Sequence, residues 1–568
     1  MAKPGWDRLA YWLVLGGYLV LALSSLLAGQ ISWDEESDYL GLRDQLAHAF
    51  RLLSGERSDY QAIHSNLEYY GIAGLLPAWL LWFLHRGWHT GRFSLERTLF
   101  HPAAEHQLTG FFTLSHAVLL VEMVLLSLVV VATARSLALR RPWLAGALTL
   151  ATPTLLGHSF TNAKDVPFAL FYSLFTLGLV RRVRLPADLL GRWRLARPAP
   201  LALLGATLMV NQKLVAVLPV LESEVALALL RAVRGRAGIM GLPPSRRAKR
   251  FVALLLPVLV LPALALAGAL LLQPSAWGLP PWRFLSEAFT TFAVHSWGGC
   301  MWFDGRCVGV RDPSWSAARY MLQWLPVKLP LLLLLLPLVQ VAAWARHVGR
   351  RGVWGSGAPR DGLLLLALQP LLIPTLAALR NSNLYDADRH LLFVVPPLTV
   401  FAVMGFERLL EWPSARPAWR CPRTWALAVA ILLAAGQLLD VLLLQPYQLA
   451  YFNEIARHRL NHANTAVEYW SVSAKEAVQQ AQLRGRLPVN PTVADSLSTA
   501  PLFIGFRQLG GRVVPGAPTR LEFQLRGPPA FRAPLPAGHV CSKPVEVSRR
   551  QFLAPKLVMS RLIVCRPA

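Results

Sequence analysis

The chain has 568 residues, of which 54% are hydrophobic and 15% are charged, and its mean hydropathy is +0.40. A soluble domain does not need so many long apolar runs, so the composition indicates a membrane protein with several spans. The net charge of +26 does not indicate a nucleic-acid partner, because the basic residues gather in short segments between apolar runs. Segments 181–197 and 231–250 hold six and seven Lys or Arg against one acidic residue and none, which is the pattern of cytoplasmic loops.

Placing these basic segments in the cytoplasm predicts eleven crossings, with the amino terminus inside and the carboxyl terminus outside. A further apolar stretch, 70–84, would invert every later loop if it crossed. It is therefore expected to be a juxtamembrane or re-entrant helix within a long first outer loop, 30–107. The expected crossings lie near 9–29, 108–133, 142–159, 166–180, 200–212, 214–230, 251–272, 325–345, 362–379, 391–409 and 425–444.

The fold expected from this pattern is an all-α polytopic membrane domain over residues 1–445, with juxtamembrane helices beside about eleven transmembrane helices. Residues 446–568 hold no membrane-length apolar run and predict a small α/β domain on the outer side. Within it, Glu468 to Arg484 is expected to be a helix and Val545 to Val564 a pair of strands. A disulfide between Cys541 and Cys565 is favoured, whereas Cys300 and Cys307 are equally well explained as paired or free.

Charged residues cluster where the chain leaves the first crossing and in later outer loops. Four acids stand within five positions, and carboxylates at the membrane edge suit chemistry on a lipid-linked substrate. Other outer loops add bases and one more acid at corresponding places. The residues singled out are Asp34, Glu35, Glu36 and Asp38, then His64, Lys164, Asp165, Lys213, Arg389 and His390.

Sugar transfer from a polyprenyl phosphate would use such a set. The acceptor hydroxyl needs a carboxylate to take its proton, and the departing phosphate needs cations. Asp34 is the candidate base with Glu35 as its partner, and Asp165 would orient the acceptor. A divalent cation on Asp34 and Asp165 is left open. The candidate contacts to substrate are Lys164, Arg389, Lys213, His64 and His390. Each has a plainer interpretation as a solvated surface group, a helix-end residue or an interfacial side chain.

Several motifs, in order along the chain, resemble those of clan C glycosyltransferases, which use polyprenyl-phosphate sugars. The resemblance is to protein O-mannosyltransferases and lipid A aminoarabinose transferases, and in particular to their bacterial members. The matching segments are Trp33-Asp34-Glu35, Asn162 to Phe168, Asp388 to Leu398, Pro446 to Glu454 and Glu468 to Ala477.

The resemblance implies the clan C fold, inverting transfer with Asp34 as base, and a bacterial inner-membrane enzyme whose active site and carboxyl-terminal domain are periplasmic. The sequence departs from the family in lacking a β-trefoil insert and a Lys-Pro-Pro near 68–71. Its acceptor could therefore be protein, glycan or lipid, and its sugar a mannose-like hexose or a pentose. The alternative is a transporter or flippase of a charged lipid, with Glu122 and Asp440 inside apolar runs as its candidate residues.

Overall fold

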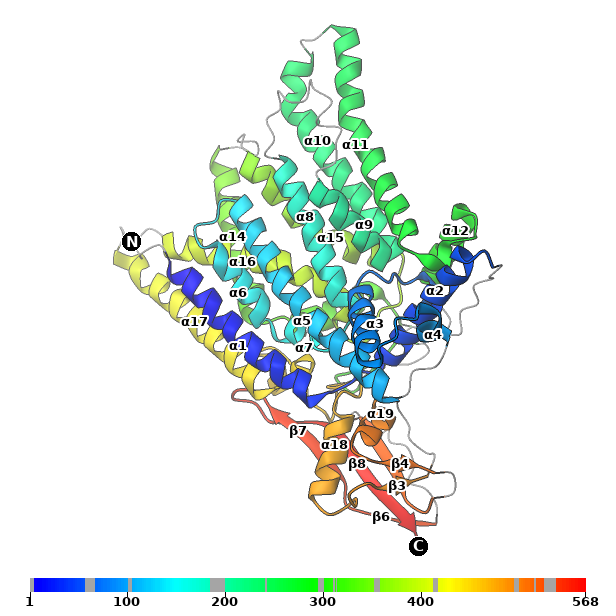
Figure 1. Cartoon of the computed structure of the whole chain (residues 1–568). Coiled ribbons are helices and arrows are strands. Elements are labelled where there is room, and N and C mark those ends of the chain that lie inside the picture. The colour runs from blue at the N-terminus through cyan, green and yellow to red at the C-terminus, as the bar shows by residue number, and fades with distance from the viewer. Residues whose placement is uncertain are drawn as a thin grey trace.

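Helices make up most of the chain, and a small sheet follows at its carboxyl end (Figure 1). The computed structural model describes residues 5–56, 67–100, 105–183, 200–240, 243–294, 301–309, 312, 314–351, 358–411, 417–494, 500–514, 517–525 and 538–568. Within these ranges, seven helical segments are long and apolar enough to cross a membrane. They fall on α1 (Trp6–Ala28), α5 (Glu105–Ser136), α8 (Asp165–Val183), α11 (Pro244–Leu271), α15 (Ala358–Leu379), η6 (Arg389–Val394) joined to α16 (Val395–Glu411), and α17 (Pro417–Leu443).

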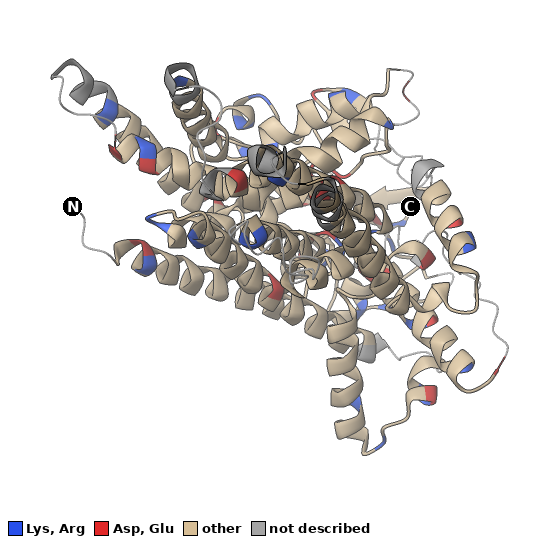
Figure 2. Cartoon of the chain, turned by 90° about the horizontal axis from the view of Figure 1, so that it is seen from above, with Lys and Arg blue, Asp and Glu red and all other residues tan. Residues whose placement is uncertain are grey.

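Seen from above, these helices are uncharged along most of their length (Figure 2). α1 shows how the sequence sets such a segment. Its apolar run ends at Gly29, which adopts a left-handed conformation with φ of +60° and donates its N–H back to Leu26 and Ser25. Glycine takes that conformation at little cost, so the helix stops where the acidic segment begins.

Two of the eleven expected crossings are broken by proline. In 142–159 Thr152 is extended ahead of Pro153, and in 325–345 Leu329 is extended ahead of Pro330. A residue before proline avoids the helical conformation, so each segment divides into two helices. The second pair is bent by 105° and would supply an eighth crossing if it counts as one span. The four helices are α6 (Pro142–Ala151), α7 (Pro153–His158), α13 (Ala317–Lys328) and α14 (Leu331–Arg351).

Residues 200–230 were expected to form a hairpin of two apolar spans, but the two helices observed there are not both long and apolar. α9 (Pro200–Gln212) has 13 residues and ends where Lys213 is extended. A short helix, η4 (Leu214–Ala216), leads into α10 (Val217–Met240), which is long but carries acidic and basic residues along its length. Over the described ranges, the number of long apolar helices is therefore smaller than the eleven crossings that the sequence predicts.

Short helices follow α1, as expected for the first outer loop. α3 has 15 residues and is about 22 Å long, shorter than the apolar core of a bilayer. It packs against α5, and α2 contacts both α4 and η5. The helices of the first outer loop are α2 (Glu35–Leu53), η1 (Leu67–Tyr69), α3 (Leu76–Thr90) and α4 (Leu95–Phe100). Two further helices follow α11, namely η5 (Pro274–Ala276) and α12 (Pro281–Val294).

The carboxyl-terminal part holds a four-stranded antiparallel sheet, a separate parallel pair of short strands (β3 and β4) and short helices. β8 is central and pairs with β5, β6 and β7, so the expected strands over 545–564 are confirmed. Cys541 of β6 lies opposite Cys565 of β8 and forms the expected disulfide with it. Cys307 is also disulfide-bonded, and Cys300 lies outside the described residues. The elements are η7 (Gln448–Ala450), η8 (Ala456–His458), α18 (Ala474–Leu483), β3 (Thr492–Val493), α19 (Ala500–Gln508), β4 (Arg512–Val513), β5 (Arg520–Leu525), β6 (His539–Cys541), β7 (Val545–Arg550) and β8 (Lys556–Pro567).

The helix expected from Glu468 to Arg484 is shorter, since α18 begins only at Ala474. Ser471 has a positive φ of 58°, which a helix does not tolerate. The Glu468 carboxylate instead accepts the N–H groups of Trp470 and Val472. The prediction was wrong for 468–473 because this acidic side chain folds a turn rather than starting a helix.

The sheet lies against the end of the helical part where α1 and α17 finish (Figure 1). Arg457 pairs with the buried Asp440 of α17 at 2.7 Å, and Lys475 donates to the carbonyl of Ala28 at 2.7 Å. Gln445, just after α17, donates to Ser25 of α1. Arg549 of β7 donates to the carbonyl of Gln445 at 2.7 Å. These contacts fix the carboxyl-terminal part to the helix ends from which the acidic segment emerges.

Candidate active site

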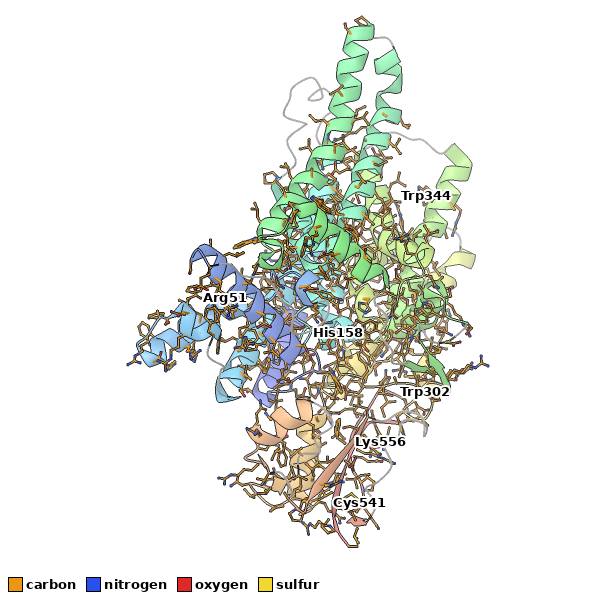
Figure 3. All side chains as sticks on the ribbon, turned by 90° about the vertical axis from the view of Figure 1, so that its right-hand side faces the viewer. Arg51, His158, Trp302, Trp344, Cys541 and Lys556 are labelled. Atoms are coloured by element: carbon orange, nitrogen blue, oxygen red, sulfur yellow. A yellow bond between two sulfur atoms is a disulfide. The ribbon has the colours of Figure 1, made fainter. Side chains whose placement is uncertain are left out.

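Charged side chains from four distant parts of the chain meet at the end of the helical part that faces the sheet. Each comes from a segment directly before or after a long helix, so helix packing brings them together. His158, the last residue of α7, marks the same interior region in Figure 3. We name this group the ion cluster, and its members are Asp34, Asp38, Lys164, Asp165, Lys213, Asp386 and Arg389.

Asp34 is the most accessible acid of the ion cluster. Its side chain is 28% exposed, against 4% for Asp38 and 5% for Asp165. Its Oδ2 lies 2.7 Å from Arg389 Nη1 and 3.8 Å from Lys164 Nζ. Although burial opposes ionisation, these two cations lower the pKa of Asp34 below its usual value. It is thus a carboxylate anion, open on one side and held by cations on the other.

Asp38 lies one turn along α2 from Asp34 and binds the same lysine, with 2.5 Å between Oδ1 and Lys164 Nζ. Burial raises the pKa of Asp38 to about 7 even though Lys164 opposes this shift. The two carboxylates raise the pKa of Lys164 against its own burial, so the lysine stays charged. Its Nζ also lies 5.1 Å from the centre of the Tyr70 ring, a cation–π contact. A cavity of about 20 Å³ beside Asp38 and Lys164 has room for about one water.

Asp165 begins α8, and its carboxylate is held by two groups. Lys213 Nζ lies 2.5 Å from Oδ1, and Asn162 donates to Oδ2 at 2.9 Å. The Asn162 side-chain oxygen accepts the N–H groups of Lys164 and Asp165, which folds the turn before the helix. This acid therefore orients lysine and asparagine, and it has little exposed surface of its own.

Lys213 is positioned by the residues that precede it. Asn211 and Gln212, at the end of α9, accept the N–H groups of Ala73 and Gly74 from the first outer loop. Gly71 packs so closely there that a Cβ atom would collide with the carbonyl group of Asn211. The interrupted helix after α9 thus ties the first outer loop to the ion cluster.

Arg389 is held by a strained turn. Asp386 and Ala387 both have φ of +57°, an unfavourable conformation for residues with a side chain. This turn aims the guanidinium at Asp34 and lets Asp386 contact it at 3.2 Å. Trp470 donates its Nε1 to Asp386 at 3.0 Å, and the ring centres of Trp470 and Tyr385 lie 5.1 and 4.8 Å from Arg389 Cζ. Burial raises the pKa of Asp386 to about 6 despite the arginine.

The structure brings together six of the eight predicted site residues, namely Asp34, Lys164, Asp165, Lys213, Arg389 and His390. Glu35 does not face the ion cluster. Its carboxylate accepts from Ser32 N and pairs with His116 of α5, each at 2.5 Å, so it fixes the turn after α1. His390 accepts a hydrogen bond from Arg389 Nε at 3.5 Å and packs edge-on against Tyr385, with ring centres 4.8 Å apart. His64 lies outside the described residues.

Four members of the site were given no role from the sequence, namely Asp38, Tyr70, Asp386 and Trp470. For Asp38 a signal existed, because residues four apart share one face of a helix and Asp34 was already a candidate. Asp386 precedes Arg389 by three residues, a similar clue. Nothing local points to Tyr70 or Trp470, which reach Lys164 and Arg389 only through the fold.

The carboxylates considered for a divalent cation are engaged by basic side chains. Arg389 and Lys164 face Asp34, and Lys213 binds Asp165. Over the described ranges, no three His, Cys, Asp or Glu side chains come together as metal ligands. The donor set therefore does not fit a resident metal.

The residues that would serve a transporter are placed differently from the ion cluster. Asp440 is fully buried, binds Arg457 at 2.7 Å and accepts the N–H of Phe552 at 2.6 Å. It joins α17 to the sheet. Glu122 is buried in α5, with no hydrogen-bond partner for Oε2 among the described residues. Asp440 therefore has a structural role, because it connects α17 to the sheet. Glu122 is a separate buried group on α5.

No protein-family model and no curated protein matches the chain. Among solved structures, the chain is similar to the oligosaccharyltransferase of Archaeoglobus fulgidus tethered to an acceptor peptide, with 11% identity and a TM-score of 0.40 over 91% of this chain. The chain spans 64% of that protein. It is also similar to ArnT of Cupriavidus metallidurans bound to undecaprenyl phosphate, with 13% identity, a TM-score of 0.40, and coverage of 99% of this chain and 98% of that one. At these TM-scores the likeness carries no argument about activity, which has to be inferred from this chain's own residues.

Proposed function

We propose that the chain is a membrane glycosyltransferase that moves a sugar from a polyprenyl-phosphate donor to a hydroxyl acceptor, with inversion at the anomeric carbon. The observation that carries this proposal is Asp34, a partly exposed carboxylate held by Arg389 and Lys164. An anionic base beside two cations suits a reaction that removes a proton and releases a phosphate. The motifs shared with clan C glycosyltransferases support the same reaction.

In the proposed reaction Asp34 takes the proton of the acceptor hydroxyl as its oxygen bonds to the anomeric carbon. The bond from that carbon to the phosphate oxygen breaks, and the electron pair leaves with the phosphate. Arg389 and Lys164 neutralise the developing charge. As they turn toward the phosphate their hold on Asp34 weakens, so the pKa of the base rises when it must accept a proton.

The other members of the ion cluster position these groups. Asp38 fixes Lys164, Asp386 fixes Arg389, and Asp165 orients Lys213, which is a third cation for the phosphate. We assign Glu35 a structural role, because its carboxylate pairs with His116. We place the reaction on the periplasmic side of a bacterial inner membrane, with residues 446–568 as a periplasmic domain over the site.

Donor turnover by the purified protein tests the proposal. Wild-type protein is incubated with a panel of polyprenyl-phosphate sugars, and release of the polyprenyl phosphate is followed by mass spectrometry. Asp34→Asn should lower turnover by about 10²- to 10⁴-fold, the usual contribution of a general base. Asp44→Asn is the matched control, because Asp44 lies on the same helix but pairs with Arg43.

The control variant should retain turnover within about threefold, since it breaks only a partly exposed pair. Full activity of Asp34→Asn would remove Asp34 from the role of base. Absence of turnover by wild-type protein with every hexosyl and pentosyl donor would count against the glycosyltransferase itself and favour a transporter.

A further inference from the structure

A second cavity, of about 480 Å³, lies beside α13 on the side of the molecule that carries the sheet. Its size falls within the usual range for small-molecule sites. The hairpin of β1 (Met301–Phe303) and β2 (Arg306–Val308) forms one wall, and residues 314–323 form another. Trp302 of this hairpin lies at the level where the helices meet the sheet (Figure 3). The lining residues used below are Asp312, Trp315, Arg319, Tyr320 and Gln323.

The hairpin that forms one wall of the cavity is held by its turn and by hydrogen bonds to the rest of the protein. Asp304 and Gly305 have φ of +49° and +79° between the paired residues Phe303 and Arg306, as a two-residue turn of this kind requires. Backbone hydrogen bonds tie the hairpin to the carboxyl-terminal part, from Gly305 N to Asn464 O at 2.7 Å and from Ala466 N to Trp302 O at 2.8 Å. Asp304 also pairs with Arg459. The cavity is thus walled by the membrane part and braced by the sheet domain.

Three buried polar atoms of the lining residues make no hydrogen bond within the described ranges, and one of them is the Tyr320 hydroxyl. The other two complement each other. Trp315 Nε1 and Gln323 Oε1 have no hydrogen-bond partner among the described residues. Buried polar groups are nearly always paired, so such atoms indicate a ligand or water. One is a donor and the other an acceptor, and Asp312 and Arg319 add a second acceptor and a second donor.

One residue connects this cavity to the ion cluster. Tyr320 lines the cavity and is 1% exposed. It also lies within electrostatic range of Asp386 and Arg389. Ala317, at the start of α13, donates its N–H to Asn381 at 2.8 Å in the segment that leads to that turn. A ligand in the cavity is therefore one side chain away from the turn that positions Arg389.

We infer that this cavity is the acceptor subsite and that it takes a carbohydrate, an inference that rests on the proposed function. Sugar hydroxyls both donate and accept hydrogen bonds, which matches a lining of paired donors and acceptors. The apolar faces of sugar rings pack on aromatic rings, and Trp315, Tyr320 and Phe303 supply three.

The test compares two glutamines, each lining a cavity on the sheet side of the protein. Gln323 lines the proposed subsite, and Gln479 lines a cavity of about 280 Å³ between α1 and α18. Full-length protein receives a radiolabelled donor with three cell-envelope fractions: glycolipid, lipid-free polysaccharide and protein. The readout is the ratio of sugar transferred to sugar released as free hydrolysis product.

Gln323→Ala and Trp315→Ala should each lower this ratio about tenfold, because one or two hydrogen bonds to the acceptor are lost. Both variants should also raise the KM for the carbohydrate fraction. Gln479→Ala should leave it unchanged. The glycolipid and polysaccharide arms show which source supplies the sugar acceptor.

An unchanged ratio in both subsite variants would overturn the inference, and so would label that enters only the protein fraction. Donor hydrolysis reports on the ion cluster and shows that each variant is folded. A wild-type protein that hydrolyses no donor would instead refute the proposed function, so the two failures are distinguishable.

Discussion

The two ends of α8 hold charges in opposite ways. At its start, Asp165 belongs to the ion cluster, where four carboxylates share three cations and Asp34 is partly exposed. Near its end, Arg182 and Glu224 form a one-to-one pair in which both Arg182 Nη atoms contact the carboxylate. Their side chains are 2% and 1% exposed. About 26 Å of helix separates the two sites.

The comparison indicates how a functional site differs from a structural ion pair. A bidentate pair satisfies both partners and leaves nothing for a ligand. In the ion cluster Arg389 contacts both Asp34 and Asp386, and Lys164 contacts both Asp34 and Asp38. Shared partners can be redistributed when an anionic substrate arrives, whereas a matched pair cannot change without a large penalty.

Removal of one arginine from each site should give the largest contrast. Arg389→Ala should lower donor turnover per folded molecule by about a thousandfold, because the leaving phosphate loses its main cation and Asp34 its main partner. Arg182→Ala should leave turnover per folded molecule within about threefold while lowering stability. Folded protein is quantified by size-exclusion chromatography before each assay. An equal loss in both variants would mean that Arg389 has a structural role only, and partial rescue by Arg389→Lys would support its charge.

A second prediction concerns the matched pair alone. Glu224→Gln should lower the free energy of unfolding by about 3 kcal/mol, because it leaves the Arg182 charge buried without a counter-charge. The double variant Arg182→Met with Glu224→Met should recover most of that loss, since apolar side chains of similar size need no partner. Detergent titration with sodium dodecyl sulfate measures both. A double variant as unstable as the single one would show that the pair itself, beyond avoiding an unpaired charge, stabilises the contact between α8 and α10.

The sequence predicted the parts of this molecule that depend on local pattern. Long apolar runs gave the seven long helices of the described ranges, and alternating short segments gave β7 and β8. Proline and extended residues at Thr152 and Leu329 interrupt apolar runs that look continuous, so these runs form pairs of shorter helices within the described ranges. The helix expected at Glu468 failed because that side chain binds nearby backbone N–H groups instead.

Site residues followed a similar division. Asp34, Lys164 and Arg389 stand in motifs beside helix ends, and the fold brings them together. Glu35 was expected to act beside Asp34 but pairs with His116, 81 positions away, and no local pattern shows which of two adjacent acids turns inward. Trp470 was missed for the same reason, because its contact to Asp386 exists only after the carboxyl-terminal part has packed on the helices.

The smallest expected effect is on the pH dependence of the free energy of unfolding, to which the ion cluster contributes through Asp38. Burial raises the pKa of Asp38 from its ordinary value of 3.8 to about 7. Its protonated form is thus favoured in the folded state, so this contribution to stability is complete below about pH 4 and is lost as the pH rises through 7. Asp38→Asn cannot titrate, and it should flatten the decline by about 1 kcal/mol between pH 5 and pH 6. Asp386, with a pKa of about 6, would supply the slope that remains. Asp44→Asn should keep the wild-type slope in the same unfolding titrations. A slope unchanged in Asp38→Asn would show that Lys164 keeps Asp38 ionised throughout, and that the ion cluster is then held as firmly as the Arg182–Glu224 pair.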